Sequence, residues 1–333
     1  MNVDDLTLTR SLGKSSFGEF FLTSKKGSST QYATELLKKA LIEGPDPKKI
    51  IDCEISILKE INHPNIVNLI EVKDTEENLY IVYEYCNGED LKIFLEKYYE
   101  KNKKGLPEEA VQHIMRQLLS VMEYLSSKEI MHRNLKLDNI FINYEYENYR
   151  KNNNILKAKI KLSDFAFAKH LKKGDLTRSI TGTPLNMSPL LLNKLTENPD
   201  YKDKGYDEKE DVWSIGSICY ELLTGRSAFD SEEIDELYQK INKGSYYLPI
   251  TLSKETISFL RSLLKFDSNK RLSYGELINH QFLKKNVNEF HKIELDELKN
   301  VTNKDKAQLL VNIKNDENCS LILKITPKKI FDL

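Results

Sequence analysis

The sequence predicts an α+β protein with two lobes, a small β-rich lobe with one main helix and a larger, mostly helical lobe. Short runs of alternating or clustered β-formers fill the chain up to about residue 87. Apolar residues then recur at helical intervals from residue 107 onward. The length of 333 residues also favours roughly two domains. We expect one lobe over 1–87, a second over 88–283, and a tail over 284–333.

The first lobe is expected to hold a twisted antiparallel sheet and a single helix. Short strands are predicted between residues 4 and 35, where Leu6 and Leu8 alternate with polar residues. Asp46 and Pro47 are typical of a helix start. The helical spacing then continues in Ile50, Ile57, Leu58 and Ile61. The β-forming runs at 65–72 and 78–85 flank a turn-like segment, which predicts a hairpin.

The second lobe is predicted from a long apolar stripe with helical spacing, which consists of Val111, Ile114, Met115, Leu118, Leu119, Met122 and Leu125. Two short strands should follow, within 139–143 and 158–165, separated by an Asn- and Tyr-rich solvated loop over 143–154. Further helices are expected at 211–223, 255–265 and 270–283. The tail contains apolar residues at 307–313 and a β-like run at 320–325, so we expect it to dock on its own lobe or on a partner.

Composition excludes several classes of function. The formal charge is -1 and the pI about 6.6, so no global charge draws the chain to nucleic acid or to an anionic membrane. The four cysteines, Cys53, Cys86, Cys219 and Cys319, lack the paired spacing of a zinc site or a disulfide framework. The N-terminus does not resemble a secretion signal, and no apolar stretch is long enough to span a membrane. We therefore expect a cytoplasmic protein without membrane insertion.

An ordered series of motifs carries the functional signal. It comprises GKSSFG at 13–18, Glu54 in a helix, HPNIV at 63–67, YEYCNGEDL at 83–91, HRNLKLDN at 132–139, SDF at 163–165, GTP at 182–184, MSP at 187–189, DVWSIG at 211–216 and KRL at 270–272. Together these motifs resemble a Ser/Thr protein kinase domain over residues 4–283. A finer resemblance is to the ULK group of autophagy-initiating kinases. The resemblance implies a bilobal kinase fold, ATP between the lobes, magnesium, and phosphoryl transfer to protein hydroxyls.

The position that the family gives to a phosphate-binding lysine departs from the pattern. The expected Ala-X-Lys reads Ala33-Thr34-Glu35, so a carboxylate replaces the ammonium group. Glu54, which would pair with that lysine, would instead face Glu35 at a cost on the order of 4 kcal/mol for like charges in contact. Lys38 lies three residues further along a strand and should point to the opposite face unless a bulge intervenes. Lys14 in the glycine-rich loop is a second conceivable substitute.

The catalytic and metal-binding positions are partly retained. Asn134 stands where the family has the aspartate that accepts the substrate proton, and an amide cannot act as that base. Lys136, Asn139 and Asp164 match the family, which leaves Asn139 and Asp164 as the magnesium ligands if Mg-ATP binds. The alternative is that both hold the loop by hydrogen bonds. Ala166 replaces the family's glycine after Asp164 and so removes a permissive hinge.

The adenine pocket is predicted to be degenerate in shape. Its expected lining consists of Gly13, Gly18, Phe20, Ala33, Tyr83, Glu84, Cys86 and Phe141. Phe20 and Phe141 stand where the family has aliphatic residues above and below adenine, and Tyr83 is a bulky gatekeeper. Extra ring volume in a packed slot is unfavourable. The protein is therefore expected to fill its own pocket, unless the rings rotate aside or stack on adenine.

Residues that hold the kinase fold together are retained, whereas the end of the activation segment is changed. Leu58, His132, Phe165 and Asp211 match the family's internal column and its anchor. Leu190 replaces the glutamate that normally pairs with an arginine, here Arg271, which should lose that partner. Thr177, Ser179 and Thr181 are either ordinary loop hydroxyls or phosphorylation sites that Arg133 would bind.

The combined pattern predicts a catalytically impaired pseudokinase that acts as a scaffold or allosteric regulator through protein contacts. No cofactor is expected, and the partners are expected to be proteins, with the tail 284–333 as a candidate docking segment. Two alternatives stay open. One is a weak, unconventional Ser/Thr kinase that uses Mg-ATP. The other is a structural component of a large assembly.

Overall fold

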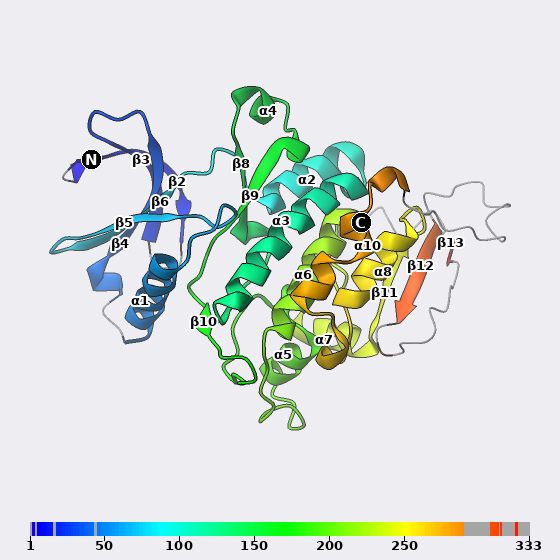
Figure 1. The fold of residues 1–333 in the computed structure, drawn as a ribbon. Helices are drawn as coiled ribbons and strands as arrows, with labels where there is room; N and C mark the ends of the chain where they lie inside the picture. Colours follow the sequence, from blue (N-terminus) through cyan, green and yellow to red (C-terminus); the bar gives the residue numbers. More distant parts are fainter. Residues whose placement is uncertain are drawn as a thin grey trace. The chain divides into compact units, whose positions relative to one another are not determined.

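The computed structural model describes residues 2–3, 5–15, 18–42, 45–289, 307–312, 314 and 324–325. The chain divides into two compact units. The first comprises residues 1–91 and 138–169, and the second comprises 92–137 and 170–333. The expected α+β kinase-like fold, with a sheet-based lobe and a helical lobe, is confirmed (Figure 1).

An antiparallel sheet of six strands forms the body of the first unit, in the order β1-β2-β3-β4-β6-β5. Its strands are β1 (Asn2–Val3), β2 (Leu6–Lys14), β3 (Gly18–Lys25), β4 (Gln31–Lys38), β5 (Leu69–Asp74) and β6 (Asn78–Glu84). The 3₁₀ turn η1 (Lys39–Leu41) and helix α1 (Pro45–Glu60) follow β4. Ile57 and Leu58 of α1 and Ile61 just after it are buried, as the helical spacing predicted, whereas Ile50 is half-buried and its neighbour Ile51 is buried instead. The predicted hairpin is the β5-β6 pair.

Residues 138–169 belong to the first unit because their backbone pairs with the segment that follows β6. Strands β8 (Ile140–Tyr144) and β9 (Ala158–Leu162) form an antiparallel ladder. The amide of Gly88 donates to the carbonyl of Ile142 at 3.0 Å, and the amide of Ile142 donates to Glu89 at 2.9 Å. The first compact unit therefore combines residues 1–91 with residues 138–169, and the expected lobe boundary at residue 87 stays a prediction.

The Asn- and Tyr-rich segment 143–154 was predicted as a loop, but it contains the five-residue helix α4 (Glu147–Lys151). Arg150 donates two hydrogen bonds to the carboxylate of Glu147, at 2.7 and 2.8 Å, which stabilises this single turn. The 3₁₀ turn η3 (Ile155–Lys157) then leads into β9. Most of the segment is solvent-exposed, as expected.

The second unit is mainly helical. Its helices are α2 (Leu91–Asn102), α3 (Glu108–Ser127), α5 (Pro189–Leu195), α6 (Lys209–Thr224), α7 (Ile234–Lys243), α8 (Lys254–Leu263), α9 (Tyr274–Ile278) and α10 (Gln281–Lys284). Short strands β7 (Ile130–Met131) and β10 (Lys169–His170) and the 3₁₀ turns η2 (Leu137–Asn139), η4 (Pro184–Asn186), η5 (Ser268–Lys270) and η6 (Val287–Glu289) connect them. The predicted stripe of α3 is buried, and so is most of α6.

The helical segment predicted at 270–283 is divided into η5, α9 and α10. Two side chains interrupt it: Ser273 caps α9 in a reciprocal capping box with Glu276, and the His280 ring accepts from the amide of Phe282 at the start of α10. Part of the tail forms β12 (Ala307–Asn312) and β13 (Lys324–Ile325), which join β11 (Ser245–Pro249) in a three-stranded sheet. The helices among the described residues include none that is long and apolar enough to cross a membrane.

Candidate active site

One face of the sheet in the first unit carries three of the predicted pocket residues together with Glu35. Phe20 of β3 lies opposite Glu35 of β4, and Ala33 of β4 lies opposite Tyr83 of β6. Because register partners and residues two apart share a face, these four side chains project to the same side. The rings of Phe20 and Tyr83 are tilted by 42°, with centroids 6.2 Å apart. An aromatic pair therefore lies on this face beside Glu35.

The glycine-rich loop joins β2 to β3 through a tight turn. The amide of Ser15 donates to the carbonyl of Gly18 at 3.0 Å, and the amide of Gly18 donates to the Ser15 hydroxyl at 3.0 Å. A Cβ atom on Gly18 would lie 2.1 Å from the carbonyl oxygen of Leu36, so this position requires glycine. Gly13 has a φ of +149° and open space around its Cα. The two predicted loop glycines therefore have different structural roles.

Three carboxyl groups interact near the position of the missing lysine. They belong to Glu35 of β4, Glu54 of α1 and Asp164, which follows β9. Burial raises the pKa of Glu35, the Ser15 hydroxyl opposes this shift, and Asp164 adds to it. Burial, followed by the charges of Asp164 and Glu35, raises the pKa of Glu54 to about 8. Glu54 is therefore mostly protonated at neutral pH.

Polar groups other than lysine surround Glu54. Its carboxyl contacts the backbone N–H of Phe165 and the hydroxyl of Tyr83. Burial raises the pKa of Tyr83 well above its usual value, so its hydroxyl stays protonated and can donate. Among the described residues, neither Glu35 nor Glu54 forms an ion pair with a lysine or arginine.

The two substitute lysines do not reach this site in the structure. Lys38 pairs in register with Asn78, without a bulge in β4, and so lies on the face opposite to Glu35. Its side chain is exposed. Lys14 ends β2 opposite Glu19 and is exposed as well. The expectation that Lys38 points away is confirmed by this register.

The retained metal-side residues lie together at the end of the β8-β9 ladder. The Asn139 amide donates to the Asp164 carboxylate at 3.0 Å, and the hydroxyl and amide of Ser163 both donate to the Asn139 carbonyl. Asp164 has a φ of +61°. Ala166 is absent from the residues with positive φ, so its methyl group causes no strain there. The geometry is consistent both with magnesium binding and with the alternative of a hydrogen-bonded loop.

The hinge segment is held from within the first unit. The Glu84 carboxylate lies 2.7 Å from the Lys161 ammonium and accepts from the amide of Asn68 at 3.2 Å. Cys86 is buried, and burial raises the pKa of its thiol to about 12, with Glu84 adding to the shift. Phe141 is half-buried in β8 and takes part in none of the ring contacts among the described residues. Its proposed place beneath adenine stays a prediction.

The catalytic-loop residues lie in the second unit. The Asn134 side chain accepts from the Thr183 hydroxyl at 3.4 Å, so the amide at the base position contacts the activation segment. Lys136 is half-buried and makes no hydrogen bond or ion pair among the described residues. The Arg133 guanidinium donates to the Ser179 hydroxyl at 2.7 Å. The amides of His132 and Arg133 both donate to the buried Asp211 carboxylate at 2.9 Å.

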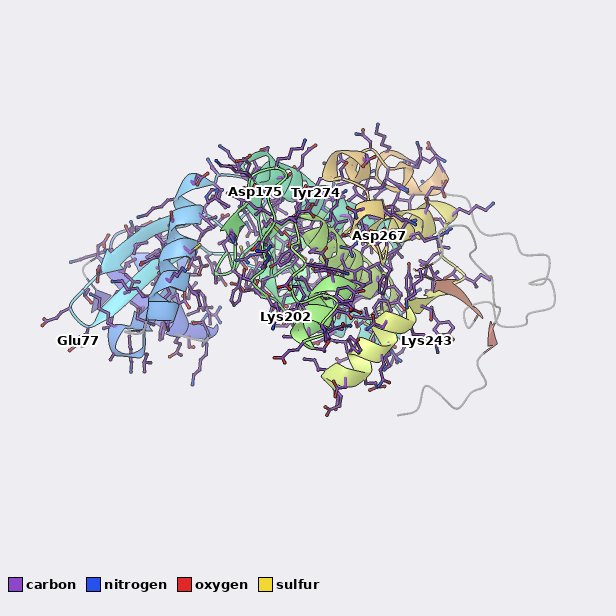
Figure 2. All side chains as sticks on the ribbon, turned by 90° about the horizontal axis from the view of Figure 1, so that it is seen from below. Glu77, Asp175, Lys202, Lys243, Asp267 and Tyr274 are labelled. Carbon is purple, nitrogen blue, oxygen red and sulfur yellow. The ribbon has the colours of Figure 1, made fainter. Side chains whose placement is uncertain are left out.

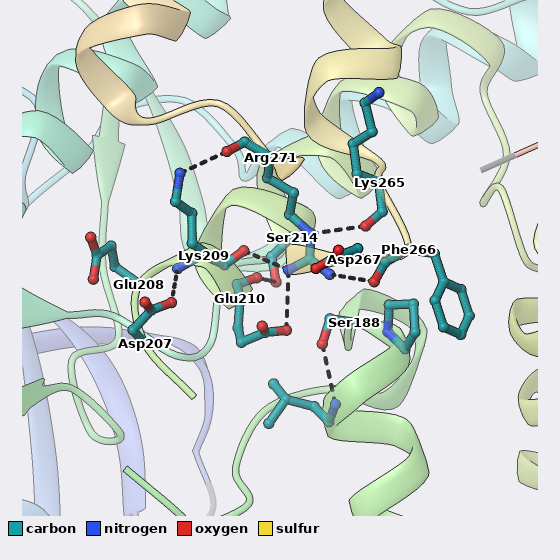
Figure 3. Close-up of polar contacts among 12 residues, drawn as sticks. Ser188, Asp207, Glu208, Lys209, Glu210, Ser214, Lys265, Phe266, Asp267 and Arg271 are labelled. Carbon is teal, nitrogen blue, oxygen red and sulfur yellow. Dashed lines mark hydrogen bonds and ion pairs between the residues drawn. The ribbon is translucent and has the colours of Figure 1, made fainter. Parts of the chain in front are cut away.

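Arg271 has a different partner from the one that the family pattern implies. Its guanidinium lies 3.2 Å from the carboxylate of Glu210 at the start of α6, and both side chains are buried. It also donates to the carbonyls of Lys209, Lys265 and Phe266 (Figure 3). Leu190, in α5, cannot accept a hydrogen bond through its side chain. The expected loss of the usual partner is therefore offset by an acidic side chain from another helix.

Sequence reasoning missed three polar residues of the site. Glu210 precedes the recognised Asp211, and its charge at the start of a buried helix was the available signal. Lys161 alternates with Lys159 in its strand, a pattern that is typical of an exposed face, so its buried ion pair with Glu84 had no signal in the sequence. Ser15 offered no distinguishing signal, because serine is common in glycine-rich turns.

The arrangement fits the magnesium side of Mg-ATP better than the phosphate side. Asn139 and Asp164 are oxygen-bearing groups held together, as magnesium requires. Glu35 and Glu54, however, bring carboxyl groups to the place where a triphosphate needs positive charge. The residues present therefore fit a magnesium ion at Asn139 and Asp164, whereas Glu35 and Glu54 do not fit the phosphates of the cofactor.

The sheet unit, the helical unit and the ordered loop motifs define a protein of the kinase class. The family model of the protein kinase domain matches residues 6–283, and the chain therefore belongs to the protein kinase family.

Curated relatives include Ser/Thr-protein kinases from distant organisms. Serine/threonine-protein kinase atg1 of Dictyostelium discoideum is 30% identical over 87% of this chain and 41% of its own length. Myosin light chain kinase A of the same organism is 32% identical over 83% of this chain and 86% of its own length. Serine/threonine-protein kinase ULK3 of Xenopus laevis is 31% identical over 84% of this chain and 56% of its own length. The chain thus spans about half the length of the atg1 and ULK3 relatives that it matches.

Proposed function

We propose that this kinase-family chain is a pseudokinase of ULK-like descent that acts as a scaffold or allosteric regulator through protein contacts. The single observation that carries the proposal is the carboxyl cluster of Glu35, Glu54 and Asp164. In an active site of this class, a lysine ammonium would stabilise the phosphate charge. In the described part of the chain, neither Glu35 nor Glu54 has a lysine or arginine as an ion-pair partner, so the cluster offers a triphosphate carboxyl groups in place of a cation.

Two further observations support the proposal. The amide of Asn134 cannot accept a proton as a carboxylate base does, and removal of a general base typically lowers a rate by about 10² to 10⁴. The Phe20 and Tyr83 rings add bulk to the sheet face that would meet adenine. The function of the protein would then depend on binding through its surface and not on turnover of a nucleotide. Protein partners are proposed, with nucleic acid and membrane insertion disfavoured by the balanced charge.

The second candidate function is a weak, unconventional Ser/Thr kinase. The hydrogen bond between Asn139 and Asp164 favours it, because the magnesium-side pair is intact. The atg1 and ULK3 relatives are named as serine/threonine-protein kinases, which also supports it. A structural role in a large assembly is the third reading, and the tail is its candidate attachment. For the compartment we propose the cytoplasm, because Cys53, Cys86 and Cys219 are free thiols.

The test is nucleotide binding by thermal shift, with ATP and with ATP plus magnesium. The pseudokinase proposal expects no stabilisation at millimolar nucleotide, whereas a ligand at 100 times its Kd would add about 2.7 kcal/mol. A radiolabel-transfer assay with the Asp164→Asn variant as the matched control tests the second candidate. Transfer that disappears in this variant would overturn the pseudokinase proposal in favour of the weak kinase.

A further inference from the structure

The tail supplies a strand partner for β11. Residues Ser245–Pro249 pair antiparallel with Gln308–Asn312 over five consecutive positions, without a register shift. In the order β11-β12-β13, β12 is the one strand neighbour of β11 among the described residues. Figure 1 shows β12 in orange beside β11 and α8. The backbone hydrogen bonds of this strand edge therefore depend on a segment that lies beyond the family match, which ends at residue 283.

The ladder also completes part of the apolar core. Tyr246 and Leu248 alternate along β11 and are 1% and 0% exposed, and Val311, the register partner of Tyr246, is 2% exposed. The Tyr246 ring packs edge-on against those of Tyr220 and Phe229, with centroids 5.4 and 6.1 Å apart. Val311 thus covers an apolar surface that belongs to the helical unit.

A second contact fixes the strand beyond its end. The Lys314 ammonium lies 5.0 Å from the centroid of the Phe266 ring, which is within the range of a cation-π interaction. The Lys314 stem passes Gly244, the residue between α7 and β11, where an added Cβ would lie 2.9 Å from the lysine Cγ. Figure 2 labels Lys243 at this end of α7. An apolar residue and a lysine three positions later therefore form the recognition pattern.

The covering strand is joined to the unit by a long connection. Seventeen residues, 290–306, separate η6 from β12. Closing a loop of this length costs little conformational entropy. The connection also keeps the strand at a high effective concentration near β11, although the strand can still leave the edge. The strand thus has the relationship to β11 that a tethered peptide has to its binding site.

We propose that the β11 edge is an acceptor site for an extended peptide strand, and that residues 307–312 occupy it as an intramolecular ligand. A competing partner would present an extended segment with a β-branched residue opposite Tyr246 and a lysine or arginine three residues further on. Main-chain hydrogen bonds would supply its affinity, and these two side chains its specificity. This site would be a contact surface for the proposed scaffold role, on which the proposal rests. Its test measures peptide binding and involves neither nucleotide binding nor phosphate transfer.

The experiment uses the full chain and a labelled synthetic peptide of residues 305–316. Val311→Asp should weaken the intramolecular strand, because it places a charge in an apolar contact. We expect the variant to stay folded and to bind the wild-type peptide at least tenfold more tightly than the wild-type chain does, since the wild-type site is occupied. A peptide that carries the same substitution is the control and should bind to neither chain.

A second variant, in which a disulfide joins the tail strand to β11, tests whether the peptide and the tail strand compete for the same strand edge. Ser245→Cys and Asn312→Cys change two register partners in a Cys319→Ser background. Paired residues of an antiparallel ladder have Cα atoms about 4.5 to 5.5 Å apart, which is within the range that a disulfide spans. The oxidised chain should bind no peptide even when it also carries Val311→Asp, and reduction should restore binding. Three outcomes would overturn the proposal: global unfolding of the Val311→Asp chain, equal peptide binding by the two chains, or equal binding by the oxidised and reduced forms. Each of these leaves the nucleotide experiment unaffected.

Discussion

The carboxylate of Glu210 and the guanidinium of Arg271 form a buried ion pair with a separation of 3.2 Å. The Arg271 guanidinium also lies 5.3 Å from the Trp213 ring, and its own carbonyl accepts from the Lys209 ammonium at 2.7 Å. The start of α6 and the η5 turn are therefore joined by two reciprocal contacts. Among the contacts described for Arg271, none is with a side chain of the activation segment.

Removal of the Glu210 charge should strongly destabilise the second unit. Glu210→Gln leaves the Arg271 charge buried, a change that typically costs about 3 to 5 kcal/mol, although the carbonyl acceptors lessen the loss. Urea denaturation measures it. The matched control is Glu236→Gln, which breaks an exposed pair with Lys240 and should leave the midpoint unchanged. A similar midpoint in both variants would contradict the importance of the buried pair.

The stability of the first unit should fall as the pH rises from about 4.5 to about 8. The Glu54 carboxyl titrates near 8 in the folded state and near 4.5 when unfolded, so the folded state binds more protons between these values. The stabilisation is complete below pH 4.5 and is lost as the pH rises through 8. The loss should amount to a few kcal/mol. Glu54→Gln should flatten this part of the profile, measured by denaturation at several pH values. Identical slopes in both chains would refute the shift.

Glu35→Lys should recover nucleotide binding if the carboxyl cluster is what prevents it. The new ammonium would lie on the same sheet face as Phe20 and would have Glu54 as its partner, whose pKa should then fall. We expect Mg-ATP to raise the melting temperature by a few degrees in this variant. Glu35→Gln is the control, because it removes the charge without adding a cation, and its response should be smaller. If Mg-ATP raises the melting temperature of neither variant, the Phe20 and Tyr83 rings, and not the carboxyl cluster, would be what prevents nucleotide binding.

Gly18→Ala should destabilise the sheet by about 1 to 3 kcal/mol, because its Cβ would lie 2.1 Å from a backbone oxygen that cannot move away easily. Gly275→Ala, within helix α9, is the comparison, since the atom nearest to its added Cβ would be a carboxylate oxygen of Glu123 at 4.0 Å. That change should be neutral or stabilising by about 0.5 kcal/mol. Chemical denaturation of both variants gives the difference, and equal midpoints would rule out the steric role of Gly18.

Local patterns in the sequence were sufficient to predict most of the elements. The helical spacing of Ile57, Leu58 and Ile61 and that of the α3 stripe correspond to buried faces, because one face of an amphipathic helix must be covered by other parts of the chain. The segment 143–154 was harder, since a single helical turn has no periodicity and depends on one local ion pair. The division at 270–283 depended on the Ser273 cap and the His280 ring, which a run of helix formers conceals.

The site could be predicted to the extent that strand geometry determines it. The period of two in a strand was enough to place Lys38 on the face opposite to Glu35, and β4 contains no bulge that would change this. The partners of Glu54 could not be predicted, because Tyr83 and Phe165 approach it from different elements. The replacement partner of Arg271 was missed for the same reason, since residues 210 and 271 are brought together by packing alone.

The sequence by itself determined the kinase family, the order of the elements and the positions at which chemical groups were exchanged, because motif spacing and periodicity are local properties of the chain. The tertiary structure decided which groups compensate for those exchanges. Glu54 contacts a hydroxyl and a backbone amide, and Arg271 forms an ion pair with Glu210. Strand β11 pairs with a strand more than fifty residues away in the sequence. Each of these partnerships depends on burial and on contacts between distant segments, and both arise when the chain folds.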